Sequence, residues 1–268
     1  MESHKLNTTN YKIKSWAEKY PTFIVTLENL TIHSSWEEFT KTDNFKENIE
    51  KLNKYFSYCL KFTNGKVNIF PYPDLTFNAL NITPLDKTNV VILGQDPYFN
   101  CERENGKIIP QAMGLSFSVP KGIDLPPSLK NIYKNLQKFN HIVKKPKHGN
   151  LTFWAYQGCL MLNTSLSVQE KSPNGHSEKW KEITDNLIKF ISDNTQNTVF
   201  LLWGSPALQK LYLIDDKKHK VIISSHPSPL SANNNLRTYG SFVDTDHFGE
   251  TNKYLKMHNK KQILWKII

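Results

Sequence analysis

Three side chains that can carry out chemistry follow short apolar runs of the sequence. Asp96 stands in the polar motif 94–98, Asn163 ends another run, and His226 opens the proline-rich motif 226–231. A carboxylate can orient a water molecule and accept its proton, and an imidazole can donate a hydrogen bond to developing negative charge. The planar amide of asparagine offers a donor and an acceptor to the edge of a ligand. Together these residue types suit the hydrolysis of a bond whose cleavage separates charge.

Each of these residues also has a plain structural interpretation. An aspartate after a strand is often a helix N-cap or a turn residue, and a histidine before proline is often part of a turn. Asn163 after a buried run, and Phe117 in an apolar segment, can be purely structural. The same holds for serines in turns rich in proline or glycine, here Ser128, Ser205, Ser228 and Ser231.

Four apolar runs rich in β-branched or aromatic residues precede the polar motifs, and they predict buried strands of a parallel sheet: Val90–Leu93, Cys159–Leu162, Val199–Trp203 and Val221–Ile223. Helical periodicity lies between them at Ser128–Phe139 and Glu178–Ile191. This alternation predicts an α/β fold, a single domain with a central four-stranded parallel sheet flanked by helices. Because ligands bind at the carboxyl ends of parallel strands, the polar motifs should converge on one cleft.

The amino-terminal third is less regular. Apolar residues recur at helical spacing within Trp36–Phe62, which we expect to pack on the sheet. Residues 1–33 lack a clear pattern and are expected to form a loosely attached extension, so that the catalytic domain would span 34–268.

The composition favours a soluble intracellular protein of the nucleus or cytoplasm. The 268 residues carry a net charge of +10, which attracts polyanions such as nucleic acid, although lysines scatter along the whole chain. The three cysteines, Cys59, Cys101 and Cys159, predict neither a disulfide framework nor a metal knuckle. No apolar run approaches the roughly 18 residues of a membrane span, and the first residues do not resemble a secretory signal.

The segment 90–98 closely resembles the water-activating loop of family 1 uracil-DNA glycosylases. Further segments agree with that family in order, from about Trp36 to the carboxyl terminus: 114–119 resembles the uracil-stacking segment, 126–128 the proline-rich phosphate loop, 160–164 the uracil-reading strand, 202–205 the Gly-Ser loop, and 226–231 the DNA-intercalation loop. Several motifs at suitable spacing make this resemblance far more specific than one motif alone.

The resemblance implies an enzyme that flips uracil out of DNA and hydrolyses its N-glycosidic bond without a metal or organic cofactor. Asp96 would orient and deprotonate the attacking water, and a neutral His226 would donate to uracil O2. The expected uracil-binding residues are Gln95, Tyr98, Phe117 and Asn163, with Asn163 reading the O4 and N3–H edge and Tyr98 excluding the 5-methyl group of thymine. The expected DNA-binding residues are the wedge Leu230 and the phosphate-gripping Ser128, Ser205, Ser228 and Ser231. The expected partner is uracil-containing DNA, bound by a monomer.

The chain departs from the family pattern at three places. Phe99 stands where the family usually has a histidine, which removes a phosphate contact. Extra residues at 100–110 and 239–247 are expected to border the DNA face. His176 comes near a family pattern, but its spacing to Trp180 is short and its role is unassigned.

Three other functions compete with this interpretation. A catalytically silent DNA-binding protein serving replication would not need Asp96, Asn163 and His226 together. A glycosylase of broader base preference is disfavoured by Tyr98 and Asn163. In a small-molecule nucleoside hydrolase, Leu230 and the serines of the phosphate loops would have no function.

Overall fold

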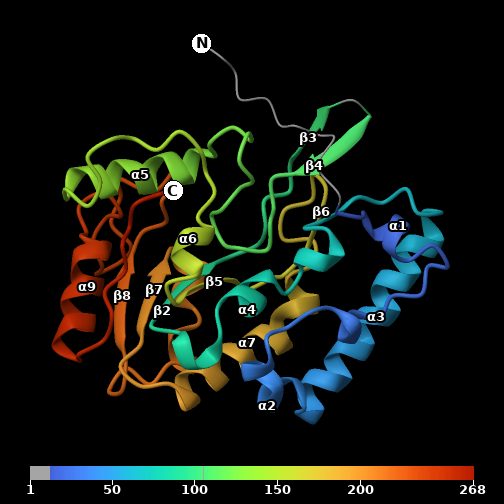
Figure 1. Ribbon diagram of the computed structural model, residues 1–268, viewed down its shortest axis with the longest axis horizontal. Helices are drawn as coiled ribbons and strands as arrows, with labels where there is room; N and C mark the ends of the chain where they lie inside the picture. Colours follow the sequence, from blue (N-terminus) through green and yellow to red (C-terminus); the bar gives the residue numbers. More distant parts are fainter. Residues whose placement is uncertain (1–12, 105) are drawn as a thin grey trace.

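A four-stranded parallel sheet forms the centre of the computed structural model, which describes residues 13–104 and 106–268 (Figure 1). The strands lie side by side in the order β5 (Cys159–Asn163), β2 (Val90–Gly94), β7 (Val199–Trp203) and β8 (Lys220–Ser224). In register, Val90 of β2 pairs with Cys159 on one side and with Val199 on the other. The predicted α/β class and the predicted strands are confirmed, each boundary to within one residue.

Every residue of β2, β5 and β7 is buried, whereas the edge strand β8 is partly exposed. A parallel sheet buried on both faces needs helices around it, and Figure 1 shows α9 on the left, α5 above, and α3 and α7 to the lower right. The helices are α1 (Trp16–Lys19), α2 (Glu37–Thr40), α3 (Asp43–Phe62), α4 (Asn78–Ile82), α5 (Pro127–Lys138), α6 (Thr152–Ala155), α7 (Ser177–Asn194), α8 (Ser205–Leu208) and α9 (His247–Met257). Short 3-10 turns occupy Leu27–Asn29, Ser34–Trp36, Pro73–Leu75, Leu85–Lys87 and Leu211–Leu213.

The long helices bury the apolar faces that their sequences predict. In α7 the residues at helical spacing, Trp180, Ile183, Leu187 and Ile191, are all buried. A large apolar side chain contributes about 1.5–3 kcal/mol when fully buried, so this face accounts for much of the attachment of the helix. The periodic stretch from Trp36 onward is interrupted where Thr42 caps α3, its side chain accepting the N–H of Phe45 at 3.2 Å.

The amino-terminal segment packs against α3. Trp16 is 1% exposed, its ring centroid lies 4.8 Å from that of Phe56, and its indole N–H donates to the carbonyl of Pro71 at 3.0 Å. Leu27 is also buried. These contacts correct the expectation of loose attachment for residues 13–33, and residues 1–12 of the expected extension lie outside the described residues.

Both expected insertions have defined structures. Residues 100–110 contain a hairpin in which β3 (Cys101–Glu104) pairs antiparallel with β4 (Lys107–Pro110). Residues 239–247 lead into α9, whose N-cap Asp246 accepts the N–H of Gly249 at 2.9 Å. A second small pairing joins β1 (Ile69–Phe70) to β6 (Val168–Gln169). The role of either insertion toward nucleic acid stays a prediction.

All four strands of the central sheet run in the same direction, so their carboxyl ends lie along one edge. Gly94 and Asn163 are paired there, at the ends of neighbouring strands. This edge is where the loops bearing the polar motifs begin. Across residues 13–104 and 106–268, the structure contains no helix long and apolar enough to cross a membrane.

Candidate active site

A cavity of about 150 Å³ opens at the carboxyl edge of the sheet. It is lined by residues from three of the strand ends together with the segment before α5 and the first turn of that helix. Eight of these residues were singled out from the sequence: Gln95, Asp96, Tyr98, Phe99, Phe117, Ser128, Asn163 and His226. Three of the four predicted motifs therefore converge on this cavity, and the fourth, Gly204–Ser205, lines an adjoining groove.

Asp96 is half-buried beside the cavity. Its Oδ2 atom accepts the backbone N–H of Asn174 at 2.8 Å. Burial raises the pKa of the Asp96 carboxyl, and the hydrogen bond from Asn174 opposes that rise. The site thus presents a carboxylate fixed at one oxygen.

Gln95 ties the loop after β2 to its neighbours. Its carbonyl oxygen accepts the N–H of Ser165 at 2.9 Å and the hydroxyl of Thr164 at 2.8 Å. Its side-chain Nε2 donates to Oδ1 of Asn174 at 2.5 Å. The loop is therefore held by the segment after β5 through its backbone and by Asn174 through its side chain.

Asn163 is buried at the end of β5, directly against Gly94 of β2. A Cβ atom added at Gly94 would lie 2.1 Å from Oδ1 of Asn163, closer than any real contact allows. The side-chain amide therefore occupies space that only a glycine leaves open, and this packing fixes its place in the cavity wall.

His226 is neutral at pH 7, because burial lowers the pKa of its imidazole to about 4. Its Nδ1 atom accepts the backbone N–H of Ser228 at 3.1 Å, so the ring proton resides on Nε2. Gly204 has φ +89°, and a Cβ there would lie 2.8 Å from Cβ of His226. The arrangement provides a neutral hydrogen-bond donor in the wall of the cavity.

Aromatic rings form the other walls. Phe117 adopts a left-handed backbone with φ +61°, and its ring centroid lies 5.3 Å from that of Trp203 and 5.7 Å from that of His226. The Tyr98 hydroxyl donates to the carbonyl of Phe117 at 3.4 Å. Tyr98 and Phe117 are thus held to each other, which makes the pocket a preformed slot.

The predicted DNA-contact residues gather beside the cavity. Ser205, Ser228 and Ser231 line an adjoining groove of about 330 Å³ that shares Gln95 and His226 with it. The hydroxyls of Ser228 and Ser231 lie 2.9 Å apart, and Ser231 donates to the carbonyl of His226 at 3.1 Å. Leu230, on the same loop, is 90% exposed. Single exposed apolar side chains are common on protein surfaces, and Val143 is 93% exposed, so the role of Leu230 stays a prediction.

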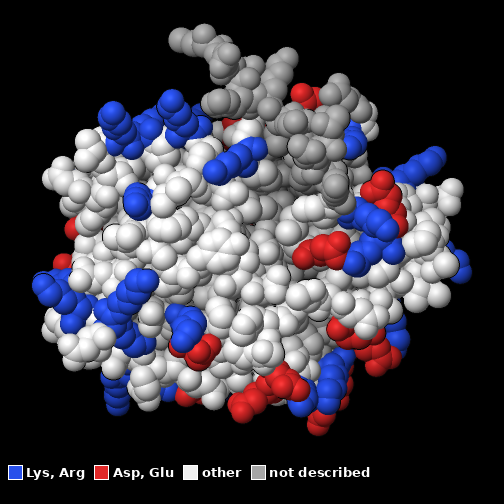
Figure 2. Space-filling view, in the orientation of Figure 1, with Lys and Arg blue, Asp and Glu red and all other residues white. Residues whose placement is uncertain are grey.

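The positive charge is spread out over the face that Figure 2 shows. On the face shown in Figure 2, lysines and arginines lie at the left and upper left and also along the right, whereas acidic groups lie toward the right and the lower edge. No continuous basic patch covers the described part of this face. Affinity for a polyanion would therefore combine a diffuse field with the local donors around the groove.

Two residues near the site were not assigned from the sequence. His176 is 2% exposed, its Nδ1 lies 3.0 Å from the Ser167 hydroxyl, and its ring packs edge-on against Tyr55 and Phe56. It is a structural anchor before α7. Asn174 contacts both Gln95 and Asp96 and was missed; its place in a Pro-Asn-Gly turn was the available signal.

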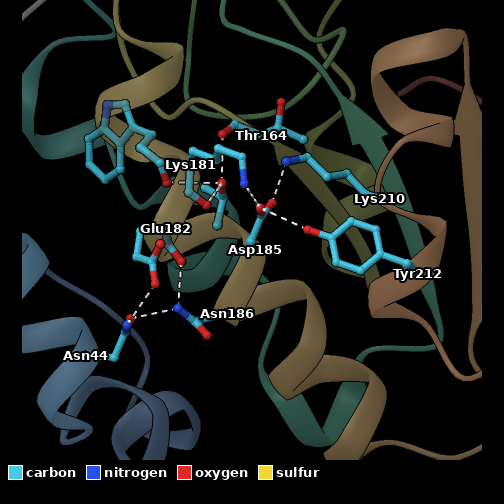
Figure 3. Close-up of polar contacts among 10 residues, drawn as sticks. Asn44, Thr164, Lys181, Glu182, Asp185, Asn186, Lys210 and Tyr212 are labelled. Atoms are coloured by element: carbon cyan, nitrogen blue, oxygen red, sulfur yellow. Dashed lines mark hydrogen bonds and ion pairs between the residues drawn. The ribbon is translucent and has the colours of Figure 1, made fainter.

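An ionic network fixes α7 behind the strand ends (Figure 3). The carboxylate of Asp185 is paired with the ammonium groups of Lys181, at 2.6 Å, and of Lys210. On the same helix the hydroxyl of Thr184 donates to the carbonyl of Thr164 at 2.8 Å. The network links the segment after Asn163 to the segment that follows α8.

The chain is similar to known proteins over most of its length. Residues 81–256 match the model of the Uracil DNA glycosylase superfamily. A protein of Acanthamoeba polyphaga mimivirus described as a probable uracil-DNA glycosylase is 40% identical over 272 residues, which cover 97% of this chain and 72% of that protein. The uracil-DNA glycosylase of Campylobacter concisus is 43% identical over 242 residues, covering 90% of this chain and 96% of the relative. The crystal structure of mimivirus uracil-DNA glycosylase matches with a TM-score of 0.90 at 39% identity, covering 99% of this chain and 98% of that one.

Proposed function

The chain belongs to the uracil DNA glycosylase superfamily, and from that premise we propose which of its residues remove uracil from DNA. It is a DNA-repair glycosylase that hydrolyses the N-glycosidic bond of uracil in DNA, giving free uracil and an abasic site. The alternative of a catalytically silent DNA-binding protein is set aside, because the relatives are named as glycosylases. The observation that carries our assignment is the common cavity of Asp96, Asn163 and His226.

Asp96 and His226 carry the hydrolysis. As the bond between the sugar and uracil breaks, positive charge develops on the sugar and negative charge on the base. Asp96 orients the water that attacks the sugar carbon and accepts its proton, and its negative charge stabilises the cationic sugar. The Nε2–H of His226 donates to uracil O2, where the negative charge accumulates. The neutral tautomer supports this role, because Nδ1 already accepts the N–H of Ser228.

Selection of uracil follows from the walls of the cavity. The Asn163 amide pairs with O4 and N3–H of uracil, a pattern that cytosine reverses. The Tyr98 ring occupies the space that the 5-methyl group of thymine would need. Phe117 stacks on the base, and Gln95 borders it.

The DNA itself is held at the groove beside the cavity. Extruding a nucleotide costs a few kcal/mol, which an apolar wedge filling the gap offsets in part. The exposure of Leu230 supports this role, and Ser128, Ser205, Ser228 and Ser231 bind phosphates near the lesion. A single copy of the chain is sufficient, because every proposed contact comes from one protomer.

The assignment is tested with a DNA duplex that contains one uracil, incubated with the enzyme in excess chelator. We expect release of free uracil to persist, and Asp96→Asn and His226→Ala each to lower turnover at least about 100-fold, because each removes a group that acts on developing charge. Thermal unfolding of both variants provides the folding control. Near-normal turnover of a folded Asp96→Asn variant would remove Asp96 from the mechanism, and loss of activity with chelator would show that a metal takes part.

A further inference from the structure

A short segment between β6 and α7 lies against the loop that carries Asp96. The backbone N–H of Lys171 donates to the carbonyl of Phe99 at 3.1 Å. Three residues further along, Asn174 makes two hydrogen bonds with the same loop. Its backbone N–H donates to Oδ2 of Asp96 at 2.8 Å, and its Oδ1 accepts from Nε2 of Gln95 at 2.5 Å. The segment 171–174 therefore braces the loop at three points.

The residue type at position 174 meets two requirements at once. Asn174 has φ +61°, in the left-handed region that few residues other than glycine and asparagine adopt readily. That conformation is the one in which its N–H reaches Asp96. Its side chain also supplies the acceptor for Gln95, which glycine could not do.

The segment is anchored from behind. The carbonyl of Asn174 accepts the N–H of Ser177 at the start of α7, and His176 is buried between them. In contrast, Asn174 itself is exposed, so its side chain contributes little buried area to the fold. A role in stability alone does not account for its contacts with Asp96 and Gln95.

We propose that Asn174 is a positioning residue for the glycosylase reaction, its backbone N–H holding the Asp96 carboxylate and its side-chain amide holding Gln95. The inference rests on the role of Asp96 proposed above. By donating to Oδ2, Asn174 leaves the other carboxylate oxygen to orient water, and it favours the ionised form that accepts the proton. The side-chain contact keeps Gln95 in place at the border of the uracil site.

Two substitutions separate the backbone contact from the side-chain contact. Asn174→Gly keeps the left-handed backbone and its N–H but removes the amide. Asn174→Val disfavours positive φ strongly, because valine is β-branched, and so withdraws the N–H from Asp96. Asn140→Val is the matched control, because Asn140 is also exposed, also has φ +61°, and lies at the far end of α5.

The readout is the pH profile of single-turnover uracil release, measured with the thermal stability of each variant. We expect Asn174→Val to lower the rate about 10- to 100-fold at neutral pH and to move the acid limb toward higher pH, because the carboxylate loses a charge-assisted donor. Asn174→Gly should lower the single-turnover rate only about 2- to 10-fold, with an unmoved acid limb. Asn140→Val should lose as much stability as Asn174→Val and keep the wild-type profile.

The other titratable groups lining the described cavity are Tyr98 and His226. Because the pKa of His226 lies at about 4, its own titration can contribute to the acid limb. Measuring Asn174→Val in the His226→Ala background removes that contribution, and the shift should remain.

Two results would overturn the positioning role. One is a wild-type pH profile for Asn174→Val. The other is a rate that falls only in proportion to the loss of thermal stability, while the acid side of the pH profile stays where it is in the wild type. Failure of the underlying mechanism gives a different result, because Asp96→Asn would then be active. An inactive Asp96→Asn variant together with unaffected Asn174 variants would reject this inference alone.

Discussion

Burial moves the pKa values of Asp96 and His226 in opposite directions, and in both cases it favours the uncharged form. For His226 this suits the proposed role, because Nδ1 of the neutral ring accepts the N–H of Ser228 and Nε2–H can donate to the base. For Asp96 it works against the proposed role, which needs a carboxylate. The donor from Asn174 offsets part of that disadvantage.

Stability should therefore respond to Asp96 in a pH-dependent way. Its folded pKa lies above its unfolded value of about 3.9, so ionisation costs the folded state more than the unfolded state. That cost is fully present above the folded pKa and absent below about pH 3.9. We expect Asp96→Asn to raise the melting temperature at pH 7 and the gain to vanish toward pH 4. Calorimetry of both proteins between about pH 4 and pH 7 measures this increase in melting temperature. An increase of the same size at every pH would contradict the prediction.

Base selection is assigned to two separate side chains. Asn163→Asp should permit some release of cytosine, and Tyr98→Ala some release of thymine, because one change alters the hydrogen-bonding edge and the other opens space for a methyl group. Free bases released from duplexes with each target pair can be measured by chromatography. If both folded variants lose uracil release and gain no other base, the pocket assignment is wrong.

Phe99 lines the cavity with an apolar ring in place of the hydrogen-bond donor that the family usually has there. We expect Phe99→His to tighten DNA binding about 3- to 30-fold by adding a donor to a phosphate, discounted for imperfect geometry. Uracil selectivity should stay unchanged, because phosphate contacts do not read bases. Binding titrations of both proteins test this change.

The alternative is that Arg103 or Lys107 in the hairpin already supplies the contact. The Arg103 guanidinium pairs with Glu170 at 2.7 Å, which makes Arg103 part of the support of the hairpin. If Phe99→His has no effect and Lys107→Ala lowers both affinity and its salt dependence, the hairpin makes the phosphate contact.

At the scale of elements, Asp185 of α7 pairs with Lys210 in the segment after α8, and the neighbouring Thr184 donates to the carbonyl of Thr164, next to Asn163 (Figure 3). The side chains of Asp185 and Lys210 are only 11% and 12% exposed. Removing one partner of such a pair leaves the other charge without compensation.

We expect Asp185→Ala to lower the free energy of unfolding by about 2–3 kcal/mol, below the range for fully buried pairs because Lys181 remains half-exposed. The control is Asp193→Ala on the same helix, where the pair with Lys189 is 3.0 Å long but exposed and should contribute about 0.5 kcal/mol or less. Urea denaturation of both variants measures the difference. Equal effects would mean that the network adds nothing beyond a surface ion pair.

At the scale of the whole molecule, the net charge of +10 sets the long-range attraction to DNA. Each phosphate neutralised contributes about −0.9 to the slope of log affinity against log salt. We expect KM for uracil-containing duplex DNA to rise steeply between about 50 and 200 mM salt, with the single-turnover rate of bound substrate nearly constant. Salt-independent KM would mean that local contacts, and not the field, determine affinity.

The sequence by itself determined the four strands of the central sheet and the long helices α3, α5 and α7. Apolar runs of three to five residues between helical patterns have few alternatives to buried parallel strands, so their boundaries came out within one residue. Since parallel strands end at a common edge, the convergence of Asp96, Asn163 and His226 also followed from the pattern. The roles of these residues came from a resemblance spread over several motifs.

Only the tertiary structure decided the contacts made between segments distant in the chain. Asn174 is 78 residues from Asp96, and no local pattern shows that its N–H meets that carboxylate. The tautomer of His226 depends on a hydrogen bond within its own loop, and its neutral state depends on burial by other segments. Residues 13–33 looked featureless because the spacing of their buried side chains is irregular and follows neither the helical nor the strand period: Trp16, Tyr20, Val25, Leu27 and Leu30. Local periodicity reports which face of an element is buried, whereas packing between elements decides what each polar group touches.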